Sequence, residues 1–180
     1  PTIRKSPSCE LSLRAFACWA TNGRITKDPA TGDLRWQYTI QNHLGNTVVL
    51  FEDRDANGTI DTEIDVPPSE VEVLQRNYYY SFGMEMDGPW QRLVDPEQDY
   101  LYNGKEKIAH EDVDLRWLNY GFRWYDPAVG RFTGVDPIAD QFAWVNGFNY
   151  AENEPIGHID LWGLQKLSIH LIGDLNIKGK

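Results

Sequence analysis

The 180-residue sequence has few cysteines, no cluster of positive charge and no long hydrophobic run. Its formal net charge is −10, and proteins that grip phosphates need concentrated Lys and Arg, so we expect this segment to bind no nucleic acid. No stretch has the length and apolarity of a membrane-spanning helix, so we expect no membrane insertion by this segment. The two cysteines, Cys9 and Cys18, could form a disulfide, but a single pair predicts little.

The sequence also lacks an initiator methionine and a signal-peptide pattern. We therefore expect it to be a piece of a longer chain, so that missing targeting signals say nothing about location. Aromatic residues, by contrast, are abundant: seven Trp, nine Tyr and seven Phe. Together with a hydrophobic fraction of 41%, they predict a folded domain with a real core and argue against disorder.

From residue 34 onward, alternating apolar residues and turn signals predict a mainly β fold. The longer expected strands are residues 36–41, 47–52, 59–66 and 70–82, and shorter ones lie within 100–104, 114–126 and 130–136. A hairpin turn is expected at 55–58, because Asn-Gly readily adopts positive φ. Helix is expected only at 138–144, with a helical turn near Pro155. A weak repeat of aromatic, Gly and basic residues indicates hairpins stacked into a large sheet.

Residues 53–61, DRDANGTID, match the start of a calcium-binding loop. The oxygen-bearing side chains at the matching positions are Asp53, Asp55, Asn57 and Asp61. The match fails at Ile64, where such a loop needs a bidentate Glu, and strands instead of helices are expected on both sides. A polar hairpin turn explains the same residues. Calcium binding, as in a calcium-dependent adhesive domain, therefore stays open as an alternative.

Other metal and nucleophile patterns are missing. The four histidines show no metal-ligand spacing with Cys or with one another, and Ser81 lacks the turn motif of a serine hydrolase. We expect no cofactor and no metal. His43 lies in a predicted turn, where a local hydrogen bond is its expected role. His158 is two residues from Asp160 and could tune its carboxyl if the segment is extended, with a plain surface histidine as the alternative.

Two aspartates stand out from the other acidic residues. Asp136 in GVDP and Asp160 in HIDL each end an apolar-flanked segment, and each precedes a sharp turn. If they meet, they cannot both ionise comfortably, so one holds a proton as an acid and the other acts as a base. Such a pair can activate a water molecule against a peptide bond.

Residues 121–164 resemble, nearly end to end, the RHS repeat-associated core domain. NHLGNT and YSFGMEMDGPW resemble the upstream part of the same module, and WYDPAVGRF is similar to the YD repeat, with Tyr125, Asp126, Gly130 and Arg131. The resemblance covers residues 34–164. Residues 1–33 form an N-terminal segment outside it, and 165–180 are expected to begin a variable C-terminal cargo region.

The resemblance implies an architecture and partners. Proteins of this family wind a β-ribbon into a hollow shell, which the core domain plugs around a C-terminal toxin. We therefore expect antiparallel hairpins of such a shell with a short helical C-terminal plug. The implied partners are the toxin cargo in cis and the upstream repeats of the same chain. The implied location is secreted or cell-surface associated.

The family's closing motif maps onto the segment that begins at Pro155. Members of the family cut their own chain just after the last apolar residue of this motif, so the resemblance predicts cleavage between Leu164 and Gln165. Gly163 would give the backbone the freedom to bend toward the site. Trp162 and Leu164 would anchor the segment in apolar surface.

The resemblance also assigns roles. The family's two catalytic aspartates map onto Asp136 and Asp160, and its supporting arginine onto Arg131. This predicts a single-turnover autoprotease of the aspartyl type, in which tethering removes the entropic cost of bringing substrate to the site. Leu161 stands where the family has Pro, which leaves the turn looser and could slow or abolish cleavage. The alternative is a non-catalytic β module, the scaffold of a bacterial surface or wall-associated protein.

Overall fold

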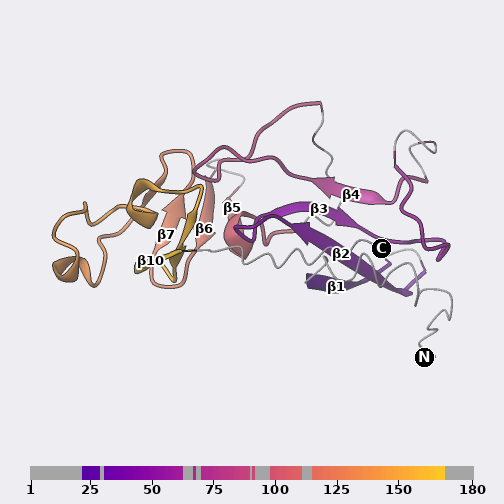
Figure 1. The fold of residues 1–180 in the computed structure, drawn as a ribbon. Helices are drawn as coiled ribbons and strands as arrows, with labels where there is room; N and C mark the ends of the chain where they lie inside the picture. The colour runs from indigo at the N-terminus through magenta and orange to yellow at the C-terminus, as the bar shows by residue number, and fades with distance from the viewer. Residues whose placement is uncertain are drawn as a thin grey trace, which may run out of the picture.

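A computed structural model describes residues 22–28, 31–62, 67, 70–89, 91, 98–110 and 115–168, and the described chain is almost entirely antiparallel β-structure (Figure 1). The first sheet contains β1 (Asn22–Lys27), β2 (Leu34–Gln41), β3 (Thr47–Phe51) and β4 (Val73–Arg76). The second contains β5 (Glu106–His110), β6 (Leu115–Asn119), β7 (Trp124–Asp126) and β8 (Arg131–Phe132). A separate hairpin is formed by β9 (His158–Leu161) and β10 (Gln165–Ser168).

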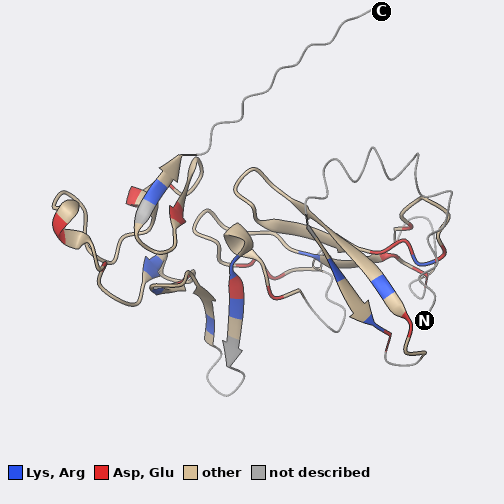
Figure 2. Ribbon diagram, turned by 90° about the horizontal axis from the view of Figure 1, so that it is seen from below, with Lys and Arg blue, Asp and Glu red and all other residues tan. Residues whose placement is uncertain are grey.

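Each strand pairs with its neighbour in the sequence, so both sheets are simple meanders. Figure 1 shows the first sheet at one end of the molecule and the β6, β7 and β10 region at the other, with β5 between them. The mainly β fold class expected from the sequence is confirmed. In Figure 2, Lys and Arg are spread singly along the described strands and loops among the acidic residues. No helix in the described ranges is long and apolar enough to cross a membrane.

Several expected strands are shorter than the sequence indicated. The expected strand 70–82 contributes only β4, and the expected strand 114–126 is divided into β6 and β7 by a turn. Gly121 lies in that turn with φ +99°, a conformation that breaks the strand. The expected strand 130–136 contributes only the two residues of β8.

The expected strand 59–66 is not formed at residues 59–62, and its second half lies outside the described residues. The expected hairpin at 55–58 is an irregular loop instead. Asp53 accepts hydrogen bonds from the backbone N–H groups of Asn57 and Gly58, at 3.1 and 3.0 Å. Short acidic side chains that bind nearby backbone donors compete with the pairing of strands, which accounts for the difference.

The helical plug is not confirmed. The expected helix at 138–144 is reduced to a 3₁₀ turn, η3 (Ala139–Gln141), and near Pro155 the chain has a 3₁₀ turn, η4 (Ala151–Asn153). Asp136 binds the N–H of Ile138 through Oδ1 at 2.9 Å, which starts a turn here. Trp144 is 71% exposed and no residue of η3 is buried, so the segment lacks the packing on which helices this short depend. The cysteines of the possible disulfide lie outside the described residues.

The core of the second half is a cluster of aromatic rings between β6, β7, β8 and η4. It contains Tyr102, Leu118, Tyr120, Tyr125, Phe132, Tyr150 and Ala151. The rings of Tyr125 and Tyr150 lie 4.7 Å apart, and both side chains are fully buried. Contacts of this kind contribute about 0.5–1.5 kcal/mol each beyond the burial of area.

The buried phenols need hydrogen-bond partners, and Asn103 supplies one for two of them. Its Oδ1 accepts from Tyr120 at 2.5 Å and from Tyr150 at 2.6 Å. Its backbone N–H and its side-chain amide both donate to Asn46 Oδ1, at 2.8 and 3.2 Å. Asn46 lies in the loop before β3, so this network joins the first sheet to the aromatic core. The core, in turn, holds β9 and the segments around it in place.

Candidate functional site: two aspartates on one arginine

Asp136 and Asp160, the two aspartates singled out in the sequence, meet at the same guanidinium. Arg123, in the turn between β6 and β7, has Nη2 at 2.8 Å from Asp136 Oδ2 and at 3.9 Å from Asp160 Oδ2. All three side chains are largely buried, with exposed fractions of 2% for Arg123, 12% for Asp136 and 4% for Asp160. The two acids therefore share one cation in a site with little water.

Arg123 also holds the backbone on two sides of the site. Its Nε donates to the carbonyl oxygen of Gly163 at 2.5 Å, and its Nη1 donates to the carbonyl oxygen of Gly147 at 2.8 Å. Its guanidinium carbon lies 3.8 Å from the ring centre of Phe132. The planar fork of an arginine suits such a multiple contact. The side chain thus ties the loop after β8 to the turn between β9 and β10.

Arg131, the supporting arginine of the sequence analysis, occupies a different position. It lies in β8, it is exposed, and its strand partner is Asp126 in β7. Side chains alternate across a strand, so with Phe132 buried in the core Arg131 points outward. The resemblance mapped the supporting arginine onto Arg131 alone, so Arg123 was not considered. The alternation around the apolar Phe132 is a sequence feature that points Arg131 away from the core.

The two aspartates have different surroundings. Asp136 is paired directly with Arg123, and its Oδ1 accepts the N–H of Ile138. Asp160 lies on β9, and its Oδ1 is buried without a hydrogen-bond partner among the described residues. Burial, with a smaller contribution from the charge of Asp136, raises the pKa of Asp160 to about 6, against the opposing effects of Arg123 and of the N–H groups of Ala151 and Leu164. A carboxyl with a raised pKa therefore stands beside one that is paired directly with the arginine.

Both aspartates line a small cavity of about 30 Å³, which is enough for a water molecule. Leu164 lines it as well, so the residue before the expected cut is at the same cavity as the two acids. The segment around η3 also lines the cavity, with Ala139, Phe142 and Val145. The lining thus combines the two carboxyls with apolar side chains.

The expected cut lies where the β9–β10 turn meets β10. The N–H of Leu164 donates to the carbonyl of Leu161 at 3.1 Å, and the two residues between them have positive φ: +61° for Trp162 and +76° for Gly163. Two consecutive positive φ values at the centre of a turn are those of a type I′ turn, here within the three-residue loop between β9 and β10. Gly163 is suited to this conformation, but a residue as bulky as Trp162 rarely adopts it. Leu161, in place of the family's Pro, lies in β9 opposite Gln165.

Pro155, His158 and His43 were also considered from the sequence. Pro155 is buried at the turn before β9. The contact that His158 makes is with Glu154, whose Oε2 lies 3.3 Å from Nδ1. His43 has no local bond of the expected kind, and its Nε2 lies 3.0 Å from the carbonyl oxygen of Ile156, which is far away in the sequence.

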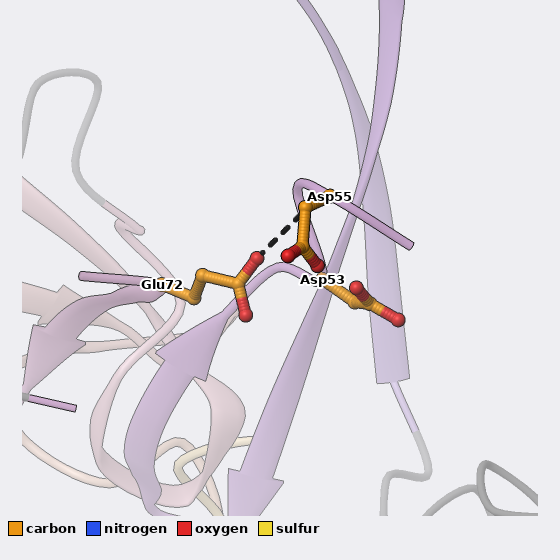
Figure 3. A group of neighbouring side chains, drawn as sticks. All are labelled: Asp53, Asp55 and Glu72. Atoms are coloured by element: carbon orange, nitrogen blue, oxygen red, sulfur yellow. Dashed lines mark hydrogen bonds between the residues drawn. The ribbon is translucent and has the colours of Figure 1, made fainter. Parts of the chain in front are cut away.

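A second acidic cluster lies in the loop after β3. Asp53, Asp55 and Glu72 place carboxylate oxygens within 4.8 Å of one another, from two segments of chain (Figure 3). Glu72 was not expected from the sequence, because it follows the loop by many residues, and Asp61 is not among the three carboxylates of the group. Carboxylates are the ligands that calcium prefers. Here they already accept backbone N–H groups: Glu72 Oε1 binds those of Arg54 and Asp55 at 2.5 and 3.3 Å.

Comparison with known proteins begins at the level of fold. A crystal structure of TcdB2-TccC3 without the hypervariable C-terminal region aligns with a TM-score of 0.56 and 20% identity over 79% of this chain and 6% of that chain. The structure of TcdB2-TccC3-TEV aligns with a TM-score of 0.57 and 21% identity over the same share of both. The chain thus has a β-rich fold of the kind found in these complexes.

Among curated proteins, double-stranded DNA deaminase toxin A of Burkholderia cenocepacia (strain H111) is 48% identical over 52 residues, which are 28% of this chain and 4% of that protein. Salivary gland surface protein 1 of Aedes aegypti is 26% identical over 152 residues, or 68% of this chain and 4% of that protein. The chain therefore spans a small fraction of the length of both relatives. No family model matches the sequence.

Proposed function

We propose that this chain is an RHS repeat-associated core module that closes a β-shell around a C-terminal toxin and cleaves itself after Leu164. The similarity to a toxin and to TcdB2-TccC3 structures supports a toxin-associated module of this fold. One observation supports the cleavage most directly: Asp160 is buried with one oxygen unpartnered among the described residues. It shares Arg123 with Asp136, and it lines the same cavity as Leu164.

The two aspartates divide the work of peptide hydrolysis. Asp136, paired with Arg123, takes a proton from a water molecule in the cavity, and the water oxygen bonds to the carbonyl carbon of Leu164. Asp160 holds a proton up to a pH of about 6 and hydrogen-bonds the carbonyl oxygen as its charge develops. The bond to Gln165 then breaks, its nitrogen leaves as an amine with a proton from the acid, and Leu164 ends in a carboxylate.

The chain supplies the substrate already in place. The β9–β10 turn is held to Arg123 through the carbonyl of Gly163, one residue before Leu164. A tethered peptide bond needs no binding step, and the effective concentration of an oriented intramolecular group can reach about 10⁵ M or more. A modest pair of carboxylates is then sufficient for one turnover. Pairing of Leu161 with Gln165 in the hairpin supports the turn in the absence of the family's Pro.

The proposal is tested in the natural, longer chain that carries the upstream repeats and the downstream region. We expect a cleavage product whose N-terminal sequence begins at Gln165, and we expect Asp136→Asn and Asp160→Asn to abolish it. Asp126→Asn, which changes an acid on the neighbouring strand β7, is the matched control and should leave cleavage intact. A chain that stays uncut in the secreted or cell-surface protein would overturn the proposed activity.

A non-catalytic β module of a surface protein is the second candidate. It is favoured by the match to a salivary gland surface protein, which extends over 68% of this chain. The replacement of the family's Pro by Leu161 points the same way. In this case the upstream repeats remain the partner in cis, and the chain serves as architecture alone. An uncut, fully folded wild-type protein would favour this candidate.

A further inference from the structure

Lys105 lies in an unusual position next to the β9–β10 turn. It precedes β5, and its Nζ is 4.8 Å from the ring centre of Trp162 and 5.0 Å from that of Tyr120. Among the described residues, no carboxylate is within salt-bridge distance of this ammonium group. Burial lowers the pKa of Lys105, and the charge of Asp160 opposes that shift, so the cation is partly desolvated and within electrostatic reach of the site.

Trp162 is held from several sides although it is the residue with the least favourable backbone in the turn. Its φ is +61°, and its carbonyl oxygen accepts the N–H of Phe122 at 3.3 Å. Its ring passes close to Gly121, where a side chain would meet the ring at 3.2 Å. The ammonium group of Lys105 lies over the Trp162 ring and also over the ring of Tyr120, which is buried in the aromatic core. The ammonium group therefore links the turn to a rigid part of the protein.

We infer that Lys105 is a positioning residue for the self-cleavage proposed above, one that clamps Trp162 to Tyr120 and so fixes the turn that presents Leu164. The inference rests on the proposed function. A contact between a cation and a ring is strongest when it is desolvated, and two rings share this cation. Without the clamp, the strained turn relaxes toward conformations in which the peptide bond beyond Leu164 is farther from the two aspartates.

The ammonium charge gives a second, electrostatic role. The charged and titratable groups around Asp160 are Arg123, Asp136, Tyr125, Glu152, Lys166 and Lys105. Lys166 pairs with Glu152 and Glu154, whereas Lys105 has no carboxylate partner in the described part of the chain, and its removal leaves those pairs and the contacts of Arg123 unchanged. Because Asp160 and Lys105 attract each other, loss of the ammonium charge favours the protonated acid. The pH above which cleavage declines then moves upward.

The test uses Lys105→Met and Lys105→Arg in the full chain, with Lys107→Met as the matched control. Lys107 lies two residues away in β5 and pairs with Glu85, with Nζ 3.4 Å from Oε2. We expect Lys105→Met to slow cleavage about tenfold, which corresponds to the loss of one to two cation–ring contacts, and to move the alkaline limb of the pH profile to higher pH. Lys105→Arg should restore most of the rate, because a guanidinium also stacks on aromatic rings. Lys107→Met should change neither the cleavage rate nor the pH profile.

A second measurement separates this inference from the proposed function. In an Asp136→Asn background, which cannot cleave, amide hydrogen exchange in the β9–β10 hairpin should be faster with Lys105→Met than with Lys107→Met. Equal exchange and equal cleavage in those two variants would overturn the clamp even if the wild type cleaves. If the wild type does not cleave, the proposed function fails, and the exchange measurement alone then decides whether Lys105 holds the turn.

Discussion

The two acidic clusters of this protein differ in how their carboxylates are satisfied. At the first cluster, the oxygens of Asp53 and Glu72 accept backbone N–H groups of the loop after β3. At the second site, Asp160 is buried to a similar degree, yet its Oδ1 has no partner in the described part of the chain. A buried carboxylate whose oxygens accept hydrogen bonds holds the backbone in place. One with an unpartnered oxygen lowers the stability of the fold and is typical of sites where chemistry uses it. The comparison supports a structural role for the first cluster and the proposed catalytic role for the second.

The largest expected effect comes from the arginine that joins the two aspartates. Arg123→Gln leaves Asp136 and Asp160 without their shared cation and breaks two bonds to backbone carbonyls. We expect a loss of about 3–5 kcal/mol in the free energy of unfolding, measured in urea, and no detectable cleavage. Arg131→Gln is the matched control on the exposed side of β8, and it should leave the free energy of unfolding and the cleavage unchanged. Cleavage that depends on Arg131 and tolerates the loss of Arg123 would contradict the geometry described here.

The second prediction concerns the acidic loop. Glu72 is 2% exposed and accepts N–H groups from Arg54, Asp55 and Asp61, so Glu72→Ala leaves three donors without an acceptor. We expect the free energy of unfolding to fall by about 3 kcal/mol, with cleavage still detectable at low temperature. Glu70→Ala, at an exposed position of the same segment, should have little effect. If Glu72→Ala were neutral in stability, the structural role of the first cluster would be wrong.

The third prediction concerns the pH dependence of stability, because the carboxyl of Asp160 stabilises the fold in its protonated form. Its pKa is raised from 3.8 to about 6, so the folded protein binds this proton more tightly than the unfolded chain. The contribution of this proton to the free energy of unfolding is therefore fully present below about pH 4. It is lost as the pH rises through about 6, with a total change of about 3 kcal/mol. Asp160→Asn removes the titrating group, so it should flatten this pH dependence and raise the melting temperature at pH 7.5 while abolishing cleavage. A lower melting temperature for Asp160→Asn at pH 7.5 would show that the carboxylate stabilises the fold.

The sequence predicted the mainly β fold and the pair of aspartates, because alternation of residues and spaced motifs are local features. It did not predict which arginine joins them, since that depends on the packing of Phe132 and on a turn that divides a single expected strand. Glu72 was missed for a related reason: it reaches the loop from a segment that the chain returns to only after many residues. Positions set by contacts between distant segments were the ones that the sequence left open.

The smallest expected effect concerns calcium. The sequence of the first loop left calcium open, and the structure brings Asp53, Asp55 and Glu72 together (Figure 3). Because Asp53 and Glu72 already accept backbone N–H groups, a cation would have to compete with those bonds, so we expect no change in melting temperature on adding 10 mM calcium. A site with a Kd of about 1 mM would instead stabilise the fold by about 1.4 kcal/mol at that concentration. A calcium-dependent rise that Asp55→Ala abolishes would give the first cluster a binding role and weaken the contrast between the two.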